Sequence, residues 1–586
     1  MGILSIGIFA AHTVRISPPT YSRWPQLWPI LTQGVTHGSS MKNRETVYHD
    51  CGRSGSLNAT LQNERVGWSW SRPYISWSTK SLVVCMMYWA LGKHLGVLRK
   101  YSVRTKSRRP SARSKRTTSR DCLVVDSIHG DIHLSPLERS VINTATFQRL
   151  RQLKQLQMGH LTYPNATHTR FAHSLGVLGI MTRITDAIGK DHFRLRKHDV
   201  ENLRLAALLH DIGHYPYSHL MEMVDSVVLT EEALEPKSTG SIIDKSEDGY
   251  PNHEEFGRLI VEGQRDVRDA IGGRDRAVEI GEIFSRTSAS NLQLSKLIHS
   301  TLDMDRMDYL IRDGRAAGVP FGEIDSNYLL NNIRISPDGM VGVDEKALAA
   351  AEHFLMARFF MHRAVYYHKT TYGFEEACRQ LLRRARNDGL YGIPRNGTDI
   401  KAMATDPKRL ATFTDAFVDS VIQKAAAEPK QSLMRDLATC IQTRRPPKML
   451  WETTVLIEKG GRNADETLFY ERCKAHIPGL ARRFRLKPGH FLVCSPKPIE
   501  FEKRGPLVPA AQMHKEPSET RDELIKVFMK NGGPEPKSMV DIPHSIVGCF
   551  ARMRLQMFRL YVVPAQRTTP VDIAKMAEAV RKTFGA

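Results

Sequence analysis

The chain has 586 residues, of which 41% are apolar and 25% are charged, a composition typical of globular proteins and long enough for more than one domain. Its formal net charge of +22 is unevenly placed, because residues 1–120 hold 19 Lys and Arg against 3 Asp and Glu. A surface for nucleic acid would therefore lie in that segment and not in the rest of the chain. We favour a solvated basic tail over a nucleic-acid reader.

The eight cysteines are scattered and none forms a Cys-x-x-Cys pair, which argues against zinc ribbons and thioredoxin-like redox motifs. Single thiols of this kind are typical of a reducing compartment, so we expect a cytoplasmic protein. The apolar stretch at 81–92 is shorter than the roughly 20 residues that a membrane-crossing helix needs. We therefore expect no association with a membrane.

Residues 1–120 contain six of the seven tryptophans, yet they show no sustained helical or strand period and end in a basic, Ser-rich run. Two interpretations stay open. The segment is either a poorly ordered extension or a stretch that is not a genuine part of the protein.

Regular patterns begin with a hairpin-like segment at 126–132 and a helical apolar spacing at 137–156, which follows the start signal Ser135-Pro136. Residues 121–385 are predicted to form a mainly α-helical bundle. Its further expected elements are helices at 173–188, 200–210, 215–226, 253–263, 291–300, 303–313 and 345–385, with a short strand at 340–343. Residues 386–586 are predicted to form a smaller mixed α/β region, with strands at 455–459, 490–495 and 557–563 and a helix at 570–584.

Three separate clusters of His and Asp along the bundle predict one metal centre. His173 lies in TRFAHSLG (169–176), His210 and Asp211 lie in LLHDIGH (208–214), and Asp305 lies in DMDRMDY (303–309). Two imidazoles and two carboxylates form a mixed nitrogen and oxygen ligand set that suits Mn, Fe, Co or Zn. A metal held in this way acidifies water and polarises a phosphoryl oxygen, which indicates hydrolysis of a phosphate ester.

The His-Asp doublet alone carries no weight, because it also occurs at 49–50 and 198–199. The copy at 210–211 differs in its surroundings. It follows an apolar helical run and precedes Gly213, which is placed to end a helix. Buried helix ends seldom carry charges that no partner or metal compensates.

The segment from 128 to 369 closely resembles the HD-domain phosphohydrolases, and among them the deoxynucleoside triphosphate triphosphohydrolases. The resemblance rests on several motifs in the same order along the chain. These are FQRLRQLKQL (147–156), RFAHSLG (170–176), LHDIGHYPYSH (209–219), HE (253–254), DMDRMDYLIRD (303–313) and RFFMHRAVYYHK (358–369).

The resemblance implies roles for individual residues. His173, His210, Asp211 and Asp305 match the divalent-metal ligands, with Mg added to the metals above. A second group matches the catalytic positions: His219 as the acid that protonates the leaving oxygen, His214 as a phosphate contact, His253 supported by Glu254, and Arg170 as a phosphate-binding cation. For each of these the alternative is a satisfied polar residue of the core.

The same resemblance implies a nucleotide pocket. Arg306 and Arg358 match cations that hold the outer phosphates, although the first is often Lys in the family. Gln155 and Asp313 match groups that bind the 3′-hydroxyl, while Tyr309 and Tyr366 match a wall against the 2′ position, and Leu156 lies beside Gln155 in the substrate set. The pocket therefore implies a nucleotide substrate, and the family also implies a homo-oligomer.

One position departs from the family pattern. Animal members are switched on by a guanine nucleotide read by a carboxylate where this chain has Asn143, with Gln148 and Arg151 at neighbouring positions. An amide removes the acceptor pair for the guanine edge. We expect activation by GTP to be weak, absent or altered in base preference.

The leading hypothesis is metal-dependent hydrolysis of deoxynucleoside triphosphates (dNTPs) to deoxynucleoside and triphosphate. One alternative is an HD-superfamily phosphohydrolase that acts on a nucleoside monophosphate or a cyclic nucleotide. Another is a nucleotide-binding or nucleic-acid-binding protein without catalysis.

Overall fold

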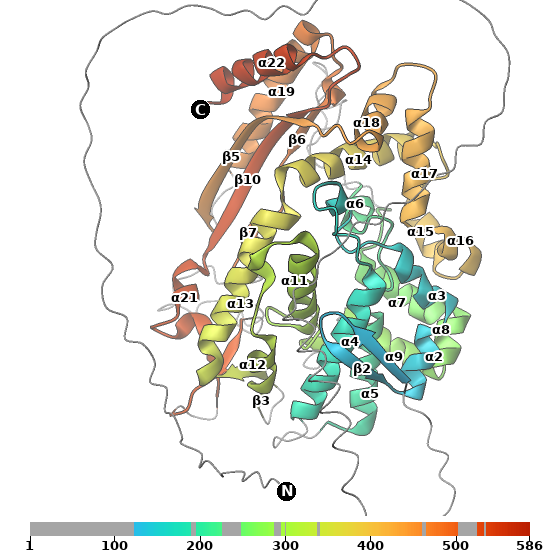
Figure 1. Ribbon diagram of the computed structural model, residues 1–586, viewed down its shortest axis with the longest axis vertical. Coiled ribbons are helices and arrows are strands. Elements are labelled where there is room, and N and C mark those ends of the chain that lie inside the picture. The colour runs from blue at the N-terminus through green and yellow to red at the C-terminus, as the bar shows by residue number, and fades with distance from the viewer. Residues whose placement is uncertain are drawn as a thin grey trace, which may run out of the picture. The chain divides into compact units, whose positions relative to one another are not determined.

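The computed structural model describes residues 122–188, 195–224, 248–285, 295–298, 300–336, 340–459, 464–501, 524–531 and 535–585. The expected extension at 1–120 lies outside these residues, as does half of the helix expected at 291–300. The described part is mainly α-helical with a few small sheets (Figure 1), which confirms the predicted fold class. Within these ranges no helix is both long and apolar enough to cross a membrane.

The centre of the helical body is α4 (Arg170–Ile188), which is buried along most of its length and packs between α5 (Lys197–Leu209) and α11 (Met304–Ala317). The predicted hairpin is present as β1 (Cys122–Asp126) and β2 (Gly130–Leu134), and it lies against α4. Helix α9 (Arg274–Ser285) packs on α5, and α7 (His253–Gly263) and α8 (Arg265–Ile271) pack on α9 (Figure 1).

Local hydrogen bonds explain where these helices begin. The side chain of Asn252 accepts from the backbone N–H of Glu255 at 2.8 Å at the start of α7. Asp303 accepts from the backbone N–H of Arg306 at 2.8 Å at the start of α11. Each cap satisfies an amide that the first helical turn leaves without an intrahelical acceptor. As a result Asp305 lies in the first turn of α11.

Three expected helices are shorter or broken. The 137–156 segment forms α2 (Pro136–Ile142), α3 (Ala145–Gln148) and the 3₁₀ turn η1 (Arg149–Gln152), because Thr144 caps a new helix by accepting from the backbone N–H of Phe147. Only α6 (His219–Glu222) forms within the described part of 215–226, because Pro216 and two residues of positive φ precede it.

The 345–385 segment is likewise interrupted. It forms α13 (Leu348–Met361), a π-helical turn η6 (His362–Tyr366) and α14 (Lys369–Asn387). A π turn adds a residue to the helical repeat and is frequent at functional sites. Here it carries Tyr366, one of the residues expected in the nucleotide pocket.

Helices continue further along the chain than the sequence pattern indicates. Four of them follow α14 and contribute apolar residues to the main core: α15 (Gly397–Met403), α16 (Pro407–Thr412), α17 (Asp415–Ala426) and α18 (Leu433–Gln442). The remaining short elements of the body are η2 (Gly159–Leu161), η4 (Pro320–Gly322), α12 (Ser326–Asn331) and η5 (Glu345–Ala347). The domain boundary expected near residue 386 stays a prediction.

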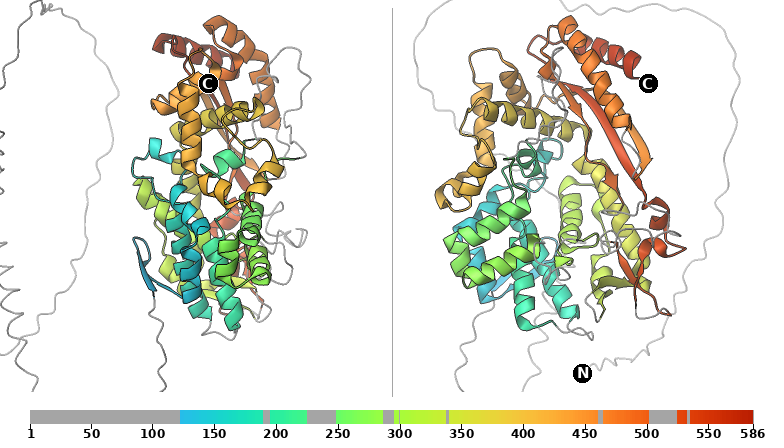
Figure 2. Two further views of the ribbon diagram at one scale, coloured as in Figure 1. Left: turned by 90° about the vertical axis from the view of Figure 1, so that its right-hand side faces the viewer. Right: turned by 180° about the vertical axis from the view of Figure 1, so that it is seen from behind.

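The C-terminal part contains a sheet in the order β5 (Lys448–Glu458), β10 (Met553–Val562), β6 (Phe491–Cys494), with β7 (Ile499–Glu500) also paired to β10. Helices α19 (Ala464–Phe484) and α22 (Pro570–Phe584) pack on it and enclose a second, smaller apolar core (Figures 1 and 2). The predicted strands and the terminal helix are therefore present, although β5 begins seven residues earlier than expected.

A further small sheet has the order β3 (Ile333–Ile335), β4 (Val341–Asp344), β8 (Lys526–Phe528), β9 (Lys537–Ser538). The β4–β8 pair is parallel and joins segments far apart in the chain. The last short elements are η7 (Pro488–His490), η9 (Met539–Asp541) and α21 (Ile546–Phe550).

Candidate metal centre and active site

The expected metal ligands come from three helices that meet near their ends. His173 lies in the first turn of α4, His210 and Asp211 follow the last residue of α5, and Asp305 lies in the first turn of α11. Both histidines are buried, with 0% and 3% of their side chains exposed, whereas Asp305 is 28% exposed. The group is therefore open to solvent on the side of Asp305.

The structure brings these four side chains together. Nε2 of His173 lies 3.0 Å from Oδ1 of Asp305 and 3.6 Å from Oδ2 of Asp211. Nε2 of His210 lies 3.3 Å from Oδ1 of Asp211 and 3.8 Å from Oδ1 of Asp305. Single ligand atoms of His173, His210 and Asp305 all lie within 4.8 Å of one another, which is the spacing of donors around one ion.

The hydrogen bonds at Nδ1 of His173 and His210 orient Nε2 of each ring for metal binding. Nδ1 of His210 lies 2.8 Å from the backbone oxygen of Ala207, and Nδ1 of His173 lies 2.7 Å from Oδ2 of Asp308. Both partners only accept, so each Nδ1 carries a proton, and each Nε2 faces the carboxylates, where it can bind a metal ion or a second proton. A lone pair facing a carboxylate is repulsive unless a cation lies between them. The donor set therefore fits a divalent metal.

The charges lead to the same conclusion. Burial alone would lower the pKa of His173, but the carboxylates of Asp305 and Asp308 outweigh it and raise this pKa to about 10. Burial would raise the pKa of Asp211, yet Arg170 and the neighbouring histidines hold it well below its usual range. The surrounding carboxylates thus favour a positive charge at Nε2 of His173, which either a proton or a metal ion supplies.

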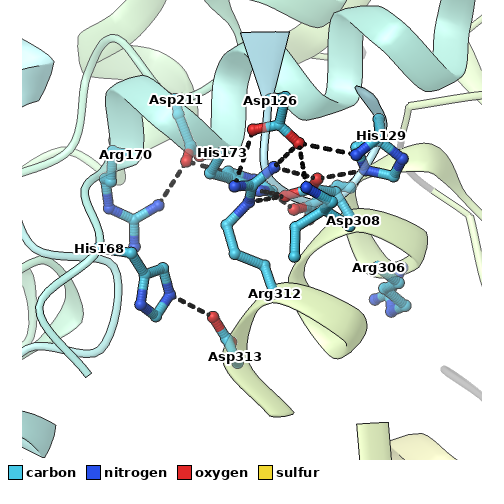
Figure 3. A network of polar contacts seen from close by, with 12 residues as sticks. Asp126, His129, His168, Arg170, His173, Asp211, Arg306, Asp308, Arg312 and Asp313 are labelled. Atoms are coloured by element: carbon cyan, nitrogen blue, oxygen red, sulfur yellow. Dashed lines mark hydrogen bonds and ion pairs between the residues drawn. The ribbon is translucent and has the colours of Figure 1, made fainter. Parts of the chain in front are cut away.

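A buried network behind His173 fixes the orientation of its ring (Figure 3). Asp308 is fully buried and accepts from His173, from Nε2 of His129 at 2.7 Å and from Nε and Nη2 of Arg312, each at 2.8 Å. Arg312 in turn pairs with Asp126 at the end of β1, with both contacts at 3.1 Å. Carboxylates that hold a metal-binding imidazole in this way set its tautomer and direction.

The fit around this network is tight at Gly176. A Cβ at this position would come 2.0 Å from Oδ1 of Asp308 and 2.4 Å from Nη2 of Arg312. The Gly in RFAHSLG is therefore required by the approach of α11 to α4.

Arg170 connects the metal ligands to the turn that follows them. Its Nη1 lies 2.5 Å from Oδ2 of Asp211, and its Nε donates to Oγ of Ser218 at 2.9 Å. The guanidinium is buried next to His173, so it can bind the same phosphate as a metal.

A second cluster lies beside the first and contains the three other expected catalytic histidines. The His214 and His253 rings are stacked at 4.1 Å, and the His219 ring meets both edge-on at 5.2 and 5.1 Å. Glu222 accepts from Nδ1 of His219 at 2.7 Å and from Nδ1 of His253 at 3.1 Å.

Glu222, which is not among the residues predicted from the sequence, is the carboxylate bonded to His253. It also accepts from the backbone N–H of His253 at 3.0 Å, while Glu254, the next residue in α7, acts on His253 through its charge. The spacing His219-x-x-Glu222 places both residues on one helical face, so the sequence did contain a signal for the pair.

One ligand atom from each of His214, His219, Glu222 and His253 also lies within 4.8 Å of the others, so this cluster has the spacing of a metal site as well as of a proton-transfer group. Burial would raise the pKa of Glu222, but His219 and His253 hold it below its usual range. Burial would lower the pKa of His253, but Glu222 raises it. The cluster therefore pairs an ionised carboxylate with a readily protonated imidazole.

The expected sugar wall is assembled from α11 and the π turn. The Tyr309 and Tyr366 rings meet edge-on at 6.0 Å, and the hydroxyl of Tyr366 donates to Oδ2 of Asp313 at 2.8 Å. Nε2 of His168 lies 2.7 Å from Oδ1 of the same carboxylate, a contact that the sequence gave no reason to expect. Gln155 has a buried side-chain oxygen without a hydrogen bond among the described residues, and Leu156 is 9% exposed.

The two expected outer-phosphate cations are close enough to influence each other. Burial and Arg306 lower the pKa of Arg358. Arg306 is bonded to the carbonyl of Ser300 and to Asp303, while Arg358 donates to two backbone oxygens at 3.3 Å. Next to them, burial and Arg358 lower the pKa of His362 to about 3, so this ring is neutral near pH 7.

The residues at the expected effector positions lie at the end of α2, at the end of α3 and in η1. Asn143 and Arg151 are exposed, and Nε of Arg151 donates to the side-chain oxygen of Gln148 at 2.7 Å. The guanidinium of Arg151 also lies 3.5 Å from the ring centre of Phe171, beside Arg170.

Residues 170–313, which supply all four expected metal ligands, match the family model for the HD domain. The chain carries an HD domain. The model of the HD associated region matches residues 324–436, which follow it directly.

Curated relatives share this part of the chain. The uncharacterized protein MJ1154 of Methanocaldococcus jannaschii is 35% identical over 353 residues, covering 60% of this chain and 66% of its own. The uncharacterized protein YwfO of Bacillus subtilis is 33% identical over 264 residues, covering 44% and 55%. The human deoxynucleoside triphosphate triphosphohydrolase SAMHD1 is 28% identical over 262 residues, covering 42% of each. The chain thus spans between about two fifths and two thirds of the length of these relatives.

Solved structures share the fold. A phosphohydrolase from Bacteroides thetaiotaomicron aligns with a TM-score of 0.57 at 21% identity, covering 75% of this chain and 99% of its own. At this identity the likeness supports the architecture around the HD domain and not a particular substrate.

Proposed function

We propose that this protein is a metal-dependent hydrolase that cleaves deoxynucleoside triphosphates to deoxynucleoside and inorganic triphosphate. The observation that carries the proposal is the convergence of His173, His210, Asp211 and Asp305 within a few ångströms, beside a buried arginine and a histidine–carboxylate cluster. The named activity of the SAMHD1 relatives supports the choice of substrate.

The first part of the reaction is attack of water on the α-phosphorus. A divalent ion held by the four ligands would lower the pKa of a water molecule and polarise the phosphoryl oxygen. Arg170, fixed by Asp211 and Ser218, is placed to neutralise the charge that develops on the phosphate oxygens. His214 is placed to contact the phosphate as a neutral ring. Burial and Arg170 hold its pKa well below its usual range.

The second part is protonation of the leaving 5′ oxygen. Glu222 on Nδ1 of His219 stabilises the protonated ring, which donates its other proton to the leaving oxygen. The half-exposed ring of His219 is accessible to a substrate, whereas His253 is more enclosed. We assign His219 as the acid and His253 with Glu222 as its support.

Arg306 and Arg358 favour a triphosphate over the alternative of a monophosphate or cyclic nucleotide. Burial and Arg306 lower the pKa of the Arg358 guanidinium, so an anion such as an outer phosphate would be stabilising beside it. A monophosphate has no outer phosphates to occupy that position. The edge-on pair of Tyr309 and Tyr366 favours a sugar without a 2′-hydroxyl.

The test is incubation of purified protein with each dNTP and Mn²⁺, followed by anion-exchange separation of the products. We expect triphosphate and deoxynucleoside, with activity lost in Asp305→Ala and retained in Asp186→Ala, which removes an exposed carboxylate of α4. Release of orthophosphate or pyrophosphate, or equal activity in both variants, would contradict the proposal.

A further inference from the structure

The two residues before His219 have backbone conformations that L-amino acids seldom adopt. Tyr217 has a φ of 51° and Ser218 a φ of 53°, and neither is a glycine. Such conformations persist only where surrounding contacts impose them. The turn therefore needs an external support.

That support comes from α17, about 200 residues further along the chain. Oδ1 of Asp415, the first residue of α17, accepts from the backbone N–H of Tyr217 at 2.8 Å. One turn later on the same helix, Asp419 accepts from the hydroxyl of Tyr217 at 2.7 Å. Tyr217 is thus held at its backbone and at the end of its side chain.

The second oxygen of the same carboxylate holds another segment of the site. Oδ2 of Asp415 accepts from the backbone N–H of Lys154 at 2.9 Å. Lys154 directly precedes Gln155 and forms an isolated β-bridge with Thr169, the residue before Arg170. Asp415 is 3% exposed, so neither bond competes with water.

The turn positions two groups of the proposed mechanism. Ser218 accepts from Nε of Arg170, and His219 is the next residue in the chain. A change in the φ of Tyr217 or Ser218 would move both groups together, and small displacements of catalytic groups reduce rates strongly.

We propose that Asp415 is a positioning residue through which the HD associated region holds the turn of Tyr217 and Ser218, and with it His219 and Arg170, in their working geometry. The expected effect of Asp415 on catalysis rests on the proposed function. The support of the turn by hydrogen bonds from Tyr217 and Lys154 to Asp415 does not.

The test uses Asp415→Asn in the full-length protein. An amide keeps the shape but turns one acceptor into a donor, which faces an N–H of either Tyr217 or Lys154. The matched control is Asp406→Asn, because Asp406 also accepts two backbone N–H groups at the start of a helix in the same region, and both of these lie in the first turn of that helix.

Hydrogen exchange measured by mass spectrometry reports on the turn directly. We expect the peptide that contains residues 215–222 to exchange on the order of tenfold faster in Asp415→Asn and to be unchanged in Asp406→Asn. Equal exchange of this peptide in wild type and Asp415→Asn would overturn the proposal, whatever the substrate is.

Kinetics on dNTPs provide the second readout. We expect kcat to fall on the order of tenfold to hundredfold in Asp415→Asn, with KM changed much less and with an unchanged metal content. A loss of kcat of the same size in Asp406→Asn would show a general loss of stability and would overturn the positioning role. If wild type hydrolyses no dNTP, the proposed function fails while the exchange result still decides the support of the turn.

Discussion

Replacement of Asp308 by Asn tests whether the buried network behind His173 controls metal binding. The carboxylate receives two hydrogen bonds on each oxygen: from His173 and Nε of Arg312 on Oδ2, and from His129 and Nη2 of Arg312 on Oδ1. An amide offers one oxygen and one NH₂ group. Whichever way it turns, two donors lose an acceptor and face another donor.

The structure also sets the expected magnitude. Hydrogen bonds to a charged group are worth about 1.5–3 kcal/mol each, and loss of a carboxylate that orients a metal-binding histidine typically reduces metal affinity by about 10–100-fold. The site here is completely buried around Asp308, so solvent does not replace the lost bonds. We expect the Kd for Mn²⁺ to rise by about 10–100-fold in Asp308→Asn.

The assay is a titration of the metal-free protein with Mn²⁺, in which binding is measured by calorimetry or by competition with a fluorescent chelator. Asp126→Asn is the matched control, because Asp126 pairs with Arg312 but does not contact His173. We expect its Kd to change by less than about threefold. An unchanged Kd in Asp308→Asn, or an equal rise in Asp126→Asn, would refute the role of the network in orienting His173.

Three further predictions concern other parts of the molecule. Tyr366→Ala opens the wall against the sugar, so kcat/KM for ATP relative to dATP should rise by up to about tenfold, and an unchanged ratio would speak against the wall. Burial raises the pKa of Glu375 to about 8, so the neutral carboxyl is favoured in the folded protein and stability is lost as the pH rises from about 4.5 through about 8. Each pKa unit corresponds to about 1.4 kcal/mol, so Glu375→Gln should flatten the decline of Tm between about pH 5 and pH 9, and parallel Tm curves would contradict this. GTP should activate dNTP hydrolysis weakly or not at all in wild type and more strongly in Asn143→Asp, and strict dependence of wild type on GTP would show that an amide suffices at this position.

Residues that act through local spacing could be predicted from the sequence. The metal ligands lie in first helical turns or directly after a helix end, where short motifs specify both the residue and its place. Glu222 has a local spacing from His219 that predicts the pair, but the adjacent His253-Glu254 pair is the stronger pattern in the sequence. Asp308 lies one helical turn after Asp305 and contacts the opposite side of His173.

Residues that act through distant contacts could not be predicted in this way. Asp415 contacts Tyr217 across 198 positions, and His168 contacts Asp313 across 145. No periodicity connects such pairs, because tertiary packing alone brings them together. The helix breaks have a similar cause: apolar spacing continues through Thr144, while a single side-chain cap starts a new helix there.

The central claim is that His173, His210, Asp211 and Asp305 hold one catalytic metal ion. Its most direct test is the metal content of protein loaded with Mn²⁺ and desalted, measured by mass spectrometry in wild type and in His210→Ala. We predict about one ion per chain in wild type and almost none in the variant. Equal metal contents in the two proteins would contradict the account.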